Sequence, residues 1–196
     1  MHERALSFRT GDLAWAMLAL AKLDPLVPGQ DYRSAAAEMG EWIEANCRRE
    51  GNGSDAGYSG GWVWRWETES WDAQGISTEH NIDLAAAFAV LHTSTDDPVW
   101  DARAAHAREF VHAMWLEDPG CFATGIDPQG AANSVRALDV QSWGAMLFRA
   151  DPNWNALDWA VDNLAMSLDA GTGFDFNTDL DGVWYEGTAQ MACALQ

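Results

Sequence analysis

The chain has 196 residues, of which 48% are hydrophobic and 21% charged, as is typical of one globular domain with its own core. Its 30 acidic and 11 basic residues give a formal net charge of −19, which repels phosphate backbones and argues against nucleic-acid binding. No apolar run near the start is long enough to span a bilayer, so we expect no membrane association. The cysteines, Cys47, Cys121 and Cys193, have neither disulfide nor metal-ligand spacing and are expected to be buried free thiols.

Apolar residues recur at helical spacing along most of the chain. The predicted helices are residues 11–23, 31–50, 77–91, 97–118, 138–148, 153–170 and 186–196. Asp31 is expected to cap the second helix, and Asp97 with Pro98 to begin the fourth. Strand signals are weak, and only "GWVWRW" and "GFDFN" alternate as short ribbons do.

Two kinds of helix alternate along the chain. The first, third, fifth and seventh are of a buried, apolar type, and we expect burial on most of their faces; the helices between them are amphipathic. Trp15, Ala85, Trp143 and Gln190 fall in register when the buried-type helices are aligned, at unequal spacings. The repeating unit is thus an inner helix, an outer helix and a long loop. The predicted architecture is an all-α ring or arc of helical hairpins, in one domain over residues 1–196.

Acidic residues stand at the start of the last three inner helices: Glu79 and Asp83, then Asp139, then Glu186. In an arc of parallel inner helices these starts share one end, so the carboxylates are expected to converge. Hydrolysis of a glycosidic bond needs two such groups, one to protonate the leaving oxygen and one as base or nucleophile. Two aromatic residues before Glu186 favour its neutral form, whereas its position at a helix start favours its charged form. Asp139 and Glu79 have no aromatic residues directly before them, so they are better candidates for the base. Alternatively, each acid only offsets a helix dipole.

Aromatic residues crowd the loops beside these helix starts. The predicted substrate-binding residues are Tyr58, Trp62, Trp64, Trp66, Trp71, Trp184 and Tyr185, with the polar His80, Asp83 and Gln141. The apolar C–H faces of sugar rings stack on indoles, and alternation in "WVWRW" puts three tryptophans on one side of a strand. The alternatives are a hydrophobic mini-core within the loop and, for His80, a local structural role in place of a hydrogen bond donated to substrate.

The stretches "STEHNIDLAAAF", "LDVQSWGAML" and "GVWYEGTAQMACAL" resemble motifs of bacterial glycoside-hydrolase-like proteins with the (α/α)6 toroid, the six-hairpin glycosidases. The resemblance runs from Thr10 onward and implies the fold class: all-α, an incomplete (α/α) toroid of helical hairpins with long active-site loops. It implies a cleft at the inner-helix starts and acidic catalysis, commonly by inversion, with Glu79, Asp139 and Glu186 as the matching acids. The predicted function is therefore a glycoside hydrolase acting on a neutral oligo- or polysaccharide, with no cofactor required.

Other functions stay open. One is a truncated, non-catalytic carbohydrate-binding fragment, and another is a helical-repeat interaction protein. A third is a toroid lyase or sugar epimerase, which usually needs a His or Tyr base; His80 is the only histidine near the proposed cleft.

The predicted ring is also incomplete. The chain supplies three hairpins and the beginning of a fourth, where a full toroid needs six. We expect a fragment or half of an assembly, with apolar faces on the first and last inner helices that favour a homodimer. Localisation depends on the same point: cytoplasmic if the chain is complete, secreted if an N-terminal signal was lost.

The stretch "DFNTDLDG" contains Asn177, Asp179, Asp181 and Gly182 at the spacing that opens a calcium loop. Thr188 stands where such a loop carries a bidentate glutamate, so the match is partial. Calcium bound by the two aspartates and Asn177 is one hypothesis. An acidic turn that shapes the cleft is the other.

Overall fold

The computed structural model describes residues 7–149, 155–169 and 171–196, so the predicted helix at 153–170 begins and ends outside the described residues. The chain forms two compact units. The first comprises the residues up to Ala113 with Ile126–Ala131, and the second comprises Met114–Gly125 with Ala132–Gln196. A single domain over the whole chain stays a prediction.

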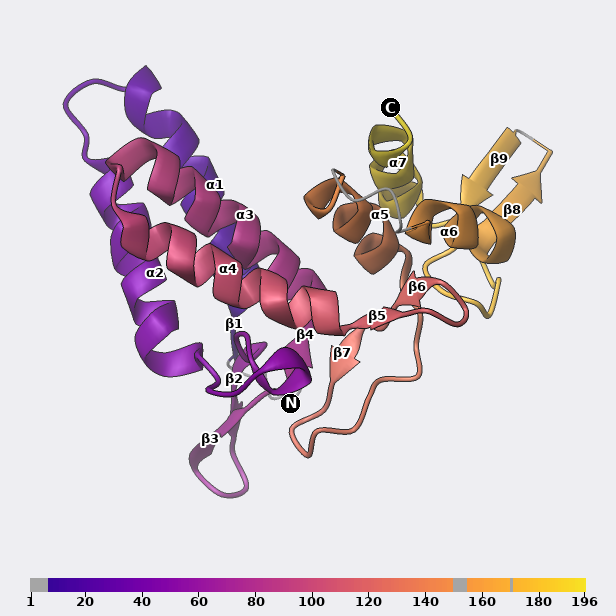
Figure 1. The fold of residues 1–196 in the computed structure, drawn as a ribbon, viewed down its shortest axis with the longest axis horizontal. Coiled ribbons are helices and arrows are strands. Elements are labelled where there is room, and N and C mark those ends of the chain that lie inside the picture. The colour runs from indigo at the N-terminus through magenta and orange to yellow at the C-terminus, as the bar shows by residue number, and fades with distance from the viewer. Residues whose placement is uncertain (1–6, 150–154, 170) are drawn as a thin grey trace. The chain divides into compact units, whose positions relative to one another are not determined.

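The first unit is built from two helical hairpins (Figure 1). Its helices are α1 (Thr10–Leu23), α2 (Tyr32–Cys47), α3 (Thr78–Thr95) and α4 (Pro98–Ala113), with short 3-10 turns at Asp24–Leu26 and Gly53–Asp55. Helix α1 packs on α2 and α3, and α3 packs on α4. The predicted pairing of an inner with an outer helix is therefore confirmed for both hairpins.

Local capping determines where the outer helices begin. The Asp31 carboxylate accepts a hydrogen bond from the Ser34 N–H at 3.1 Å, and the Asp97 carboxylate accepts one from the Val99 N–H at 3.0 Å. Both satisfy N–H groups that the first helical turn leaves without an internal partner. The predicted starts of α2 and α4 are confirmed.

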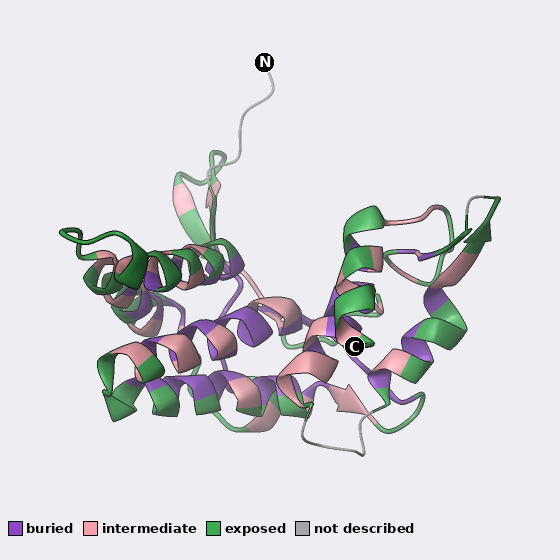
Figure 2. Cartoon of the chain, turned by 90° about the horizontal axis from the view of Figure 1, so that it is seen from above, coloured by how far each residue is buried: buried purple, intermediate pink, exposed green. Residues whose placement is uncertain are grey.

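The two inner helices of this unit differ in burial. Helix α3 is buried on nearly every face along its N-terminal two-thirds, as predicted. Helix α1 is not: its buried residues form one stripe, and the Trp15 side chain is 47% exposed. The prediction for α1 is wrong because α1 has helical neighbours on one side only among the described residues of its unit. Figure 2 shows helices with buried residues on one side and exposed residues on the other.

The loops of the first unit contain short strands. An antiparallel sheet orders β1 (Ser7–Arg9), β2 (Gly61–Arg65) and β3 (Ser70–Ala73), and β4 (Ile76–Ser77) pairs with β7 (Gly125–Ile126). The predicted ribbon at "GWVWRW" is thus confirmed. Across the β2–β3 pair, Trp64 lies opposite Trp71 and Trp62 lies opposite Ala73.

The second unit holds α5 (Leu138–Leu147), α6 (Ala156–Leu164) and α7 (Tyr185–Ala194). Two hairpins accompany them, β5 (Trp115–Leu116) with β6 (Cys121–Phe122) and β8 (Ala165–Leu168) with β9 (Gly171–Phe174). Its buried core comprises Cys121, Leu138, Trp159, Ala160, Leu164 and Met191. Two predicted helices are shorter than expected, because residues 115–118 and 165–168 enter these hairpins.

Two of the three cysteines are buried, as predicted. Burial raises the pKa of the Cys47 and Cys121 thiols. Cys193 is exposed, so the expectation is wrong there, because only Gly187 and Met191 of α7 are buried. Within the described ranges, no helix combines the length and the apolar character needed to cross a bilayer.

Candidate active site

Asp139 and Glu186 lie in the first turns of α5 and α7, at helix starts that touch each other. Gly187 lies against Leu138, since a Cβ atom on Gly187 would stand 2.7 Å from Leu138 Cδ2. Leu138 directly precedes Asp139 and Gly187 directly follows Glu186. The structure therefore brings these two predicted acids together within the second unit.

The two carboxyl groups have different surroundings. The Asp139 residue is 8% exposed, whereas Glu186 is exposed to solvent. Burial raises the pKa of the Asp139 carboxyl to about 6, with a further rise from the negative charge of Glu186; hydrogen bonds from backbone N–H groups, including the 2.7 Å bond from Val140, oppose this rise. The sequence favoured Asp139 as a base, whereas a carboxyl with a pKa of about 6 can also donate a proton near neutral pH.

One extended segment holds both helix starts. The Leu138 N–H donates to the Phe176 carbonyl and the Trp184 N–H donates to the Phe174 carbonyl, each at 2.8 Å. The Phe174 N–H in turn donates to Thr188 Oγ1 at 2.9 Å. The residues that lead into Asp139 and Glu186 are thus hydrogen-bonded to the same three-residue stretch.

The other predicted residues of this unit have distinct surroundings. Gln141 is fully buried, and its amide donates to the Phe122 and Ala137 carbonyls and accepts from the Phe122 N–H, so it joins α5 to β6. Trp184 packs against the core and meets the Phe176 ring edge-on at 5.3 Å. Tyr185 is 80% exposed and free to face a ligand. These placements favour a structural role for Gln141.

In the first unit, His80 lies in the first turn of α3 and is held by Thr10. The Thr10 hydroxyl donates its single proton to the Ser59 carbonyl at 3.0 Å, so the contact of 3.1 Å between Thr10 Oγ1 and His80 Nδ1 needs the proton on Nδ1. Burial, followed by the charge of Arg9, lowers the pKa of the His80 imidazole. With the proton on Nδ1, the lone pair of the neutral ring is on Nε2, and the hydrogen bond from His80 to substrate stays a prediction.

Glu79 and Asp83 lie on the same helix. Glu79 is partly buried in the first turn of α3, and Asp83 is 4% exposed one turn later. Both belong to the first unit, whereas Asp139 and Glu186 belong to the second. The convergence of all three predicted catalytic acids therefore stays a prediction.

The predicted aromatic residues divide between core and surface. Tyr58 is fully buried and donates its hydroxyl proton to Glu44 at 2.6 Å, and burial together with this contact raises the pKa of the phenol. No face of its ring is left for a sugar. Trp64 meets the rings of Trp66 and Trp71 edge-on at 5.9 and 5.4 Å. Trp66 and Trp71 stay 47% and 38% exposed, so these side chains form a small cluster that is open on one side.

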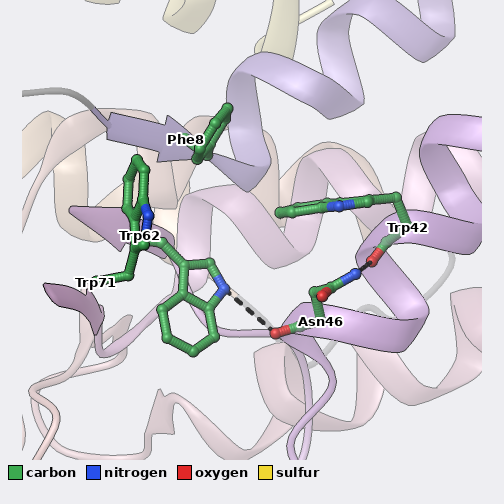
Figure 3. Close-up of a pocket in the computed structure, with 5 residues that line it drawn as sticks. All are labelled: Phe8, Trp42, Asn46, Trp62 and Trp71. Carbon is green, nitrogen blue, oxygen red and sulfur yellow. Dashed lines mark hydrogen bonds between the residues drawn. The ribbon is translucent and has the colours of Figure 1, made fainter. Parts of the chain in front are cut away.

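A pocket of about 260 Å³ lies beside this cluster (Figure 3). Its lining residues are Phe8, Trp42, Asn46, Trp62 and Trp71. The Trp62 indole donates to the Asn46 carbonyl at 3.3 Å, and the Phe8 ring lies 5.0 Å from that of Trp71. Phe8, Trp42 and Asn46 were not among the predicted binding residues. Trp42 and Asn46 are one helical turn apart on α2, but no local signal ties them to the β2–β3 loop.

The predicted calcium ligands lie in the loop that leads into α7. The carboxylates of Asp179 and Asp181 lie within 4.8 Å of each other and of Asp175, which the sequence reading did not include. The Asn177 side chain instead accepts from the Asp179 N–H at 3.0 Å. Three carboxylate oxygens are thus grouped together, and the third comes from Asp175 and not from the predicted ligand Asn177.

No protein-family model matches the sequence, and a search of curated proteins finds no significant match. Solved structures do match. A D-mannose isomerase has a TM-score of 0.68 and 13% identity, covering 96% of this chain and 53% of its own. A GH76 alpha-mannanase from Bacteroides thetaiotaomicron has a TM-score of 0.65 and 15% identity, covering 100% and 53%. A cellobiose 2-epimerase from Bacillus thermoamylovorans has a TM-score of 0.65 and 11% identity, covering 96% and 58%.

These matches confirm the predicted fold, an incomplete toroid of helical hairpins of the six-hairpin, (α/α)6 type. The chain spans about half the length of the solved structures that it matches. The matched proteins include carbohydrate-active enzymes of more than one reaction class. At 11–15% identity, the likeness concerns the fold alone.

Proposed function

We propose that this chain, which has the fold of the six-hairpin toroid enzymes, serves the hydrolysis of O-glycosidic bonds in a neutral oligo- or polysaccharide. The observation that carries the proposal is the Asp139–Glu186 pair. Asp139 is a buried carboxyl with a pKa of about 6, and Glu186 is an exposed carboxylate. The two residues lie at helix starts that are in contact. Paired carboxyl groups in unlike surroundings are what acid and base catalysis of glycoside cleavage requires.

In the proposed mechanism Asp139 is the acid. Its carboxyl proton passes to the glycosidic oxygen as the bond from that oxygen to the anomeric carbon breaks, and the bonding electrons leave with the oxygen. Glu186 removes a proton from a water molecule whose oxygen attacks the anomeric carbon from the opposite face, which inverts its configuration. Proton exchange with solvent then restores both groups. Within the first unit, and independently of this pair, the partly exposed Trp66 and Trp71 and the aromatic pocket beside them offer faces on which sugar rings can stack.

The experiment uses neutral manno- and gluco-oligosaccharides with chromatographic product analysis and NMR of the first anomer released. We expect Asp139→Asn and Glu186→Gln each to lower kcat by about 100-fold or more. Asp162→Asn, an exposed change on α6 of the same unit, is the matched control and keeps full activity. Activity should fall as the pH rises through about 6, because Asp139 then loses the proton that it donates. Undiminished turnover by Asp139→Asn would rule out this assignment.

A second candidate reaction is epimerisation or isomerisation of a sugar, and the observation that favours it is His80. A neutral imidazole protonated on Nδ1 can take a proton on Nε2 from a carbon next to a carbonyl. In that case the products would be isomers of the substrate with deuterium incorporated from D₂O, and His80→Gln would abolish the exchange. A carbohydrate-binding fragment is the remaining alternative, and it would bind sugar without any turnover.

We also propose that two copies associate. Helix α1 exposes Trp15 and Leu23 at 47% and 42%, and α7 exposes Leu195, directly after its last residue, at 55%. These are the first and last inner helices, whose apolar faces would have neighbours in a complete ring. Light scattering at micromolar concentration is expected to give twice the chain mass of 21.5 kDa, and a monomer would contradict the proposal.

A further inference from the structure

Three carboxylates gather in the loop between β9 and α7. One oxygen each from Asp175, Asp179 and Asp181 lies within 4.8 Å of the other two. A calcium ion binds oxygens at about 2.3–2.6 Å, so ligands on opposite sides of it stand up to about 5 Å apart. The spacing of these three oxygens is therefore one that a single calcium ion can bridge.

The second observation is the burial of Asp175. This residue is 3% exposed, whereas Asp179 and Asp181 are open to solvent. Asp175 Oδ1 accepts a hydrogen bond from the Phe176 N–H at 2.6 Å, but Oδ2 is buried and receives no hydrogen bond from any residue that the structure describes. None of the ion pairs among the described residues involves the three aspartates. A buried carboxylate oxygen without a donor is costly and calls for a positive partner.

The chemistry of the ligands selects the ion. The three residues offer only carboxylate oxygens, which suit hard cations better than zinc or copper. Magnesium needs near-octahedral ligands at about 2.0–2.1 Å, whereas calcium accepts irregular sets of about 6–8 oxygens that include carbonyls and water. Thr188 cannot supply the bidentate carboxylate of the helix–loop–helix calcium motif, and its hydroxyl accepts from the Phe174 N–H and donates to the Trp184 carbonyl. The site therefore departs from that motif.

We propose that Asp175, Asp179 and Asp181 bind one calcium ion, which fixes the loop joining the helix starts of the Asp139–Glu186 pair. The loop is anchored at both ends of the site: the Asp175 N–H donates to the Leu164 carbonyl at 2.9 Å, and the Trp184 N–H donates to the Phe174 carbonyl at 2.8 Å. Calcium neutralises the repulsion among three negative charges in this segment. Binding does not depend on whether the pair hydrolyses glycosides.

The test is thermal unfolding and isothermal titration of the full chain with calcium chloride, after treatment with EDTA. Calcium at about 100 times its Kd is expected to raise the Tm by about 5 °C or more, with one ion bound per chain. Magnesium at the same concentration should produce less than half of that shift. No heat of binding and no shift with calcium would overturn the proposal, and an equal shift with magnesium would overturn the assignment of calcium.

Two variants separate ligand loss from misfolding. Asp179→Asn changes an exposed side chain, so the variant folds, and we expect at least a 10-fold weaker affinity for calcium. Asp175→Asn replaces the buried charge by a neutral amide, and in EDTA it should unfold at the same temperature as the parent or a higher one while losing the calcium shift. The control Asp162→Asn keeps the full shift. A calcium shift that survives both ligand variants would refute the site.

Discussion

The raised pKa of Asp139 predicts a pH-dependent gain of stability when its carboxyl is replaced by an amide. The ordinary pKa of an aspartate is 3.8 and that of Asp139 is about 6. The folded chain therefore holds this proton more tightly than the unfolded chain. Its stabilising contribution is fully present below pH 3.8 and is lost as the pH rises through about 6. A difference of about two pH units corresponds to about 3 kcal/mol at neutral pH.

Asparagine at position 139 keeps the oxygen that accepts from the Val140 N–H but carries no charge. At pH 7.5 we expect the free energy of unfolding of Asp139→Asn to be about 2–3 kcal/mol larger than that of the parent. At pH 4 the two should agree within about 0.5 kcal/mol, because the folded Asp139 carboxyl is then protonated and only about half of the unfolded carboxyls are ionised. The measurement is urea unfolding at several pH values, monitored by tryptophan fluorescence and by hydrogen exchange of the α5 amides.

The companion variant Glu186→Gln isolates the electrostatic contribution. Removing its charge should move the pKa of Asp139 down and shrink the gain from Asp139→Asn, because that charge is one cause of the rise. Asp162→Asn should leave the pH profile of stability unchanged. A difference between parent and Asp139→Asn that is the same at pH 4 and pH 7.5 would refute the reasoning.

Two further predictions concern packing and ion pairing. Gly187→Ala should lower the free energy of unfolding by about 1–3 kcal/mol, measured in urea, because the added Cβ would clash with the Trp184 ring and stand 2.7 Å from Leu138 Cδ2; an unchanged midpoint would contradict this close packing around Gly187. Arg103→Lys should cost about 2 kcal/mol in the same assay, because Arg103 is 8% exposed and donates to both Glu41 carboxylate oxygens at 2.8 Å. The exposed Arg65→Lys is its control and should cost less than about 0.5 kcal/mol; equal losses would show that the fork geometry at Arg103 is unimportant.

The sequence predicts those parts of the fold that depend on neighbours along the chain. The caps at Asp31 and Asp97 act within three residues, so the starts of α2 and α4 follow from local spacing. The end of α4 does not. The sequence continues in helical period beyond Ala113, but the Met114 carbonyl accepts from the Ala123 N–H, and this pairing opens the β5–β6 hairpin. Distant pairing overrides the local pattern there.

The candidate site shows the same limit. Acids at inner-helix starts are visible in the sequence, and Asp139 with Glu186 do lie at touching starts. Which of them is buried depends on tertiary packing, so the raised pKa of the Asp139 carboxyl does not follow from the local sequence. Gln141 and Tyr58 look like ligand-binding residues until their partners, Phe122 and Glu44, are known. Those partners lie 19 and 14 residues away.

The difference in exposure among the three cysteines makes one of them a natural site for labelling. Cys193 is exposed on α7, two turns beyond Glu186, whereas burial keeps the Cys47 and Cys121 thiols protonated and shielded. A maleimide dye or spin label should therefore react at one position without any engineered cysteine. A reporter there would follow α7 directly when calcium, a sugar or a second copy of the chain is added.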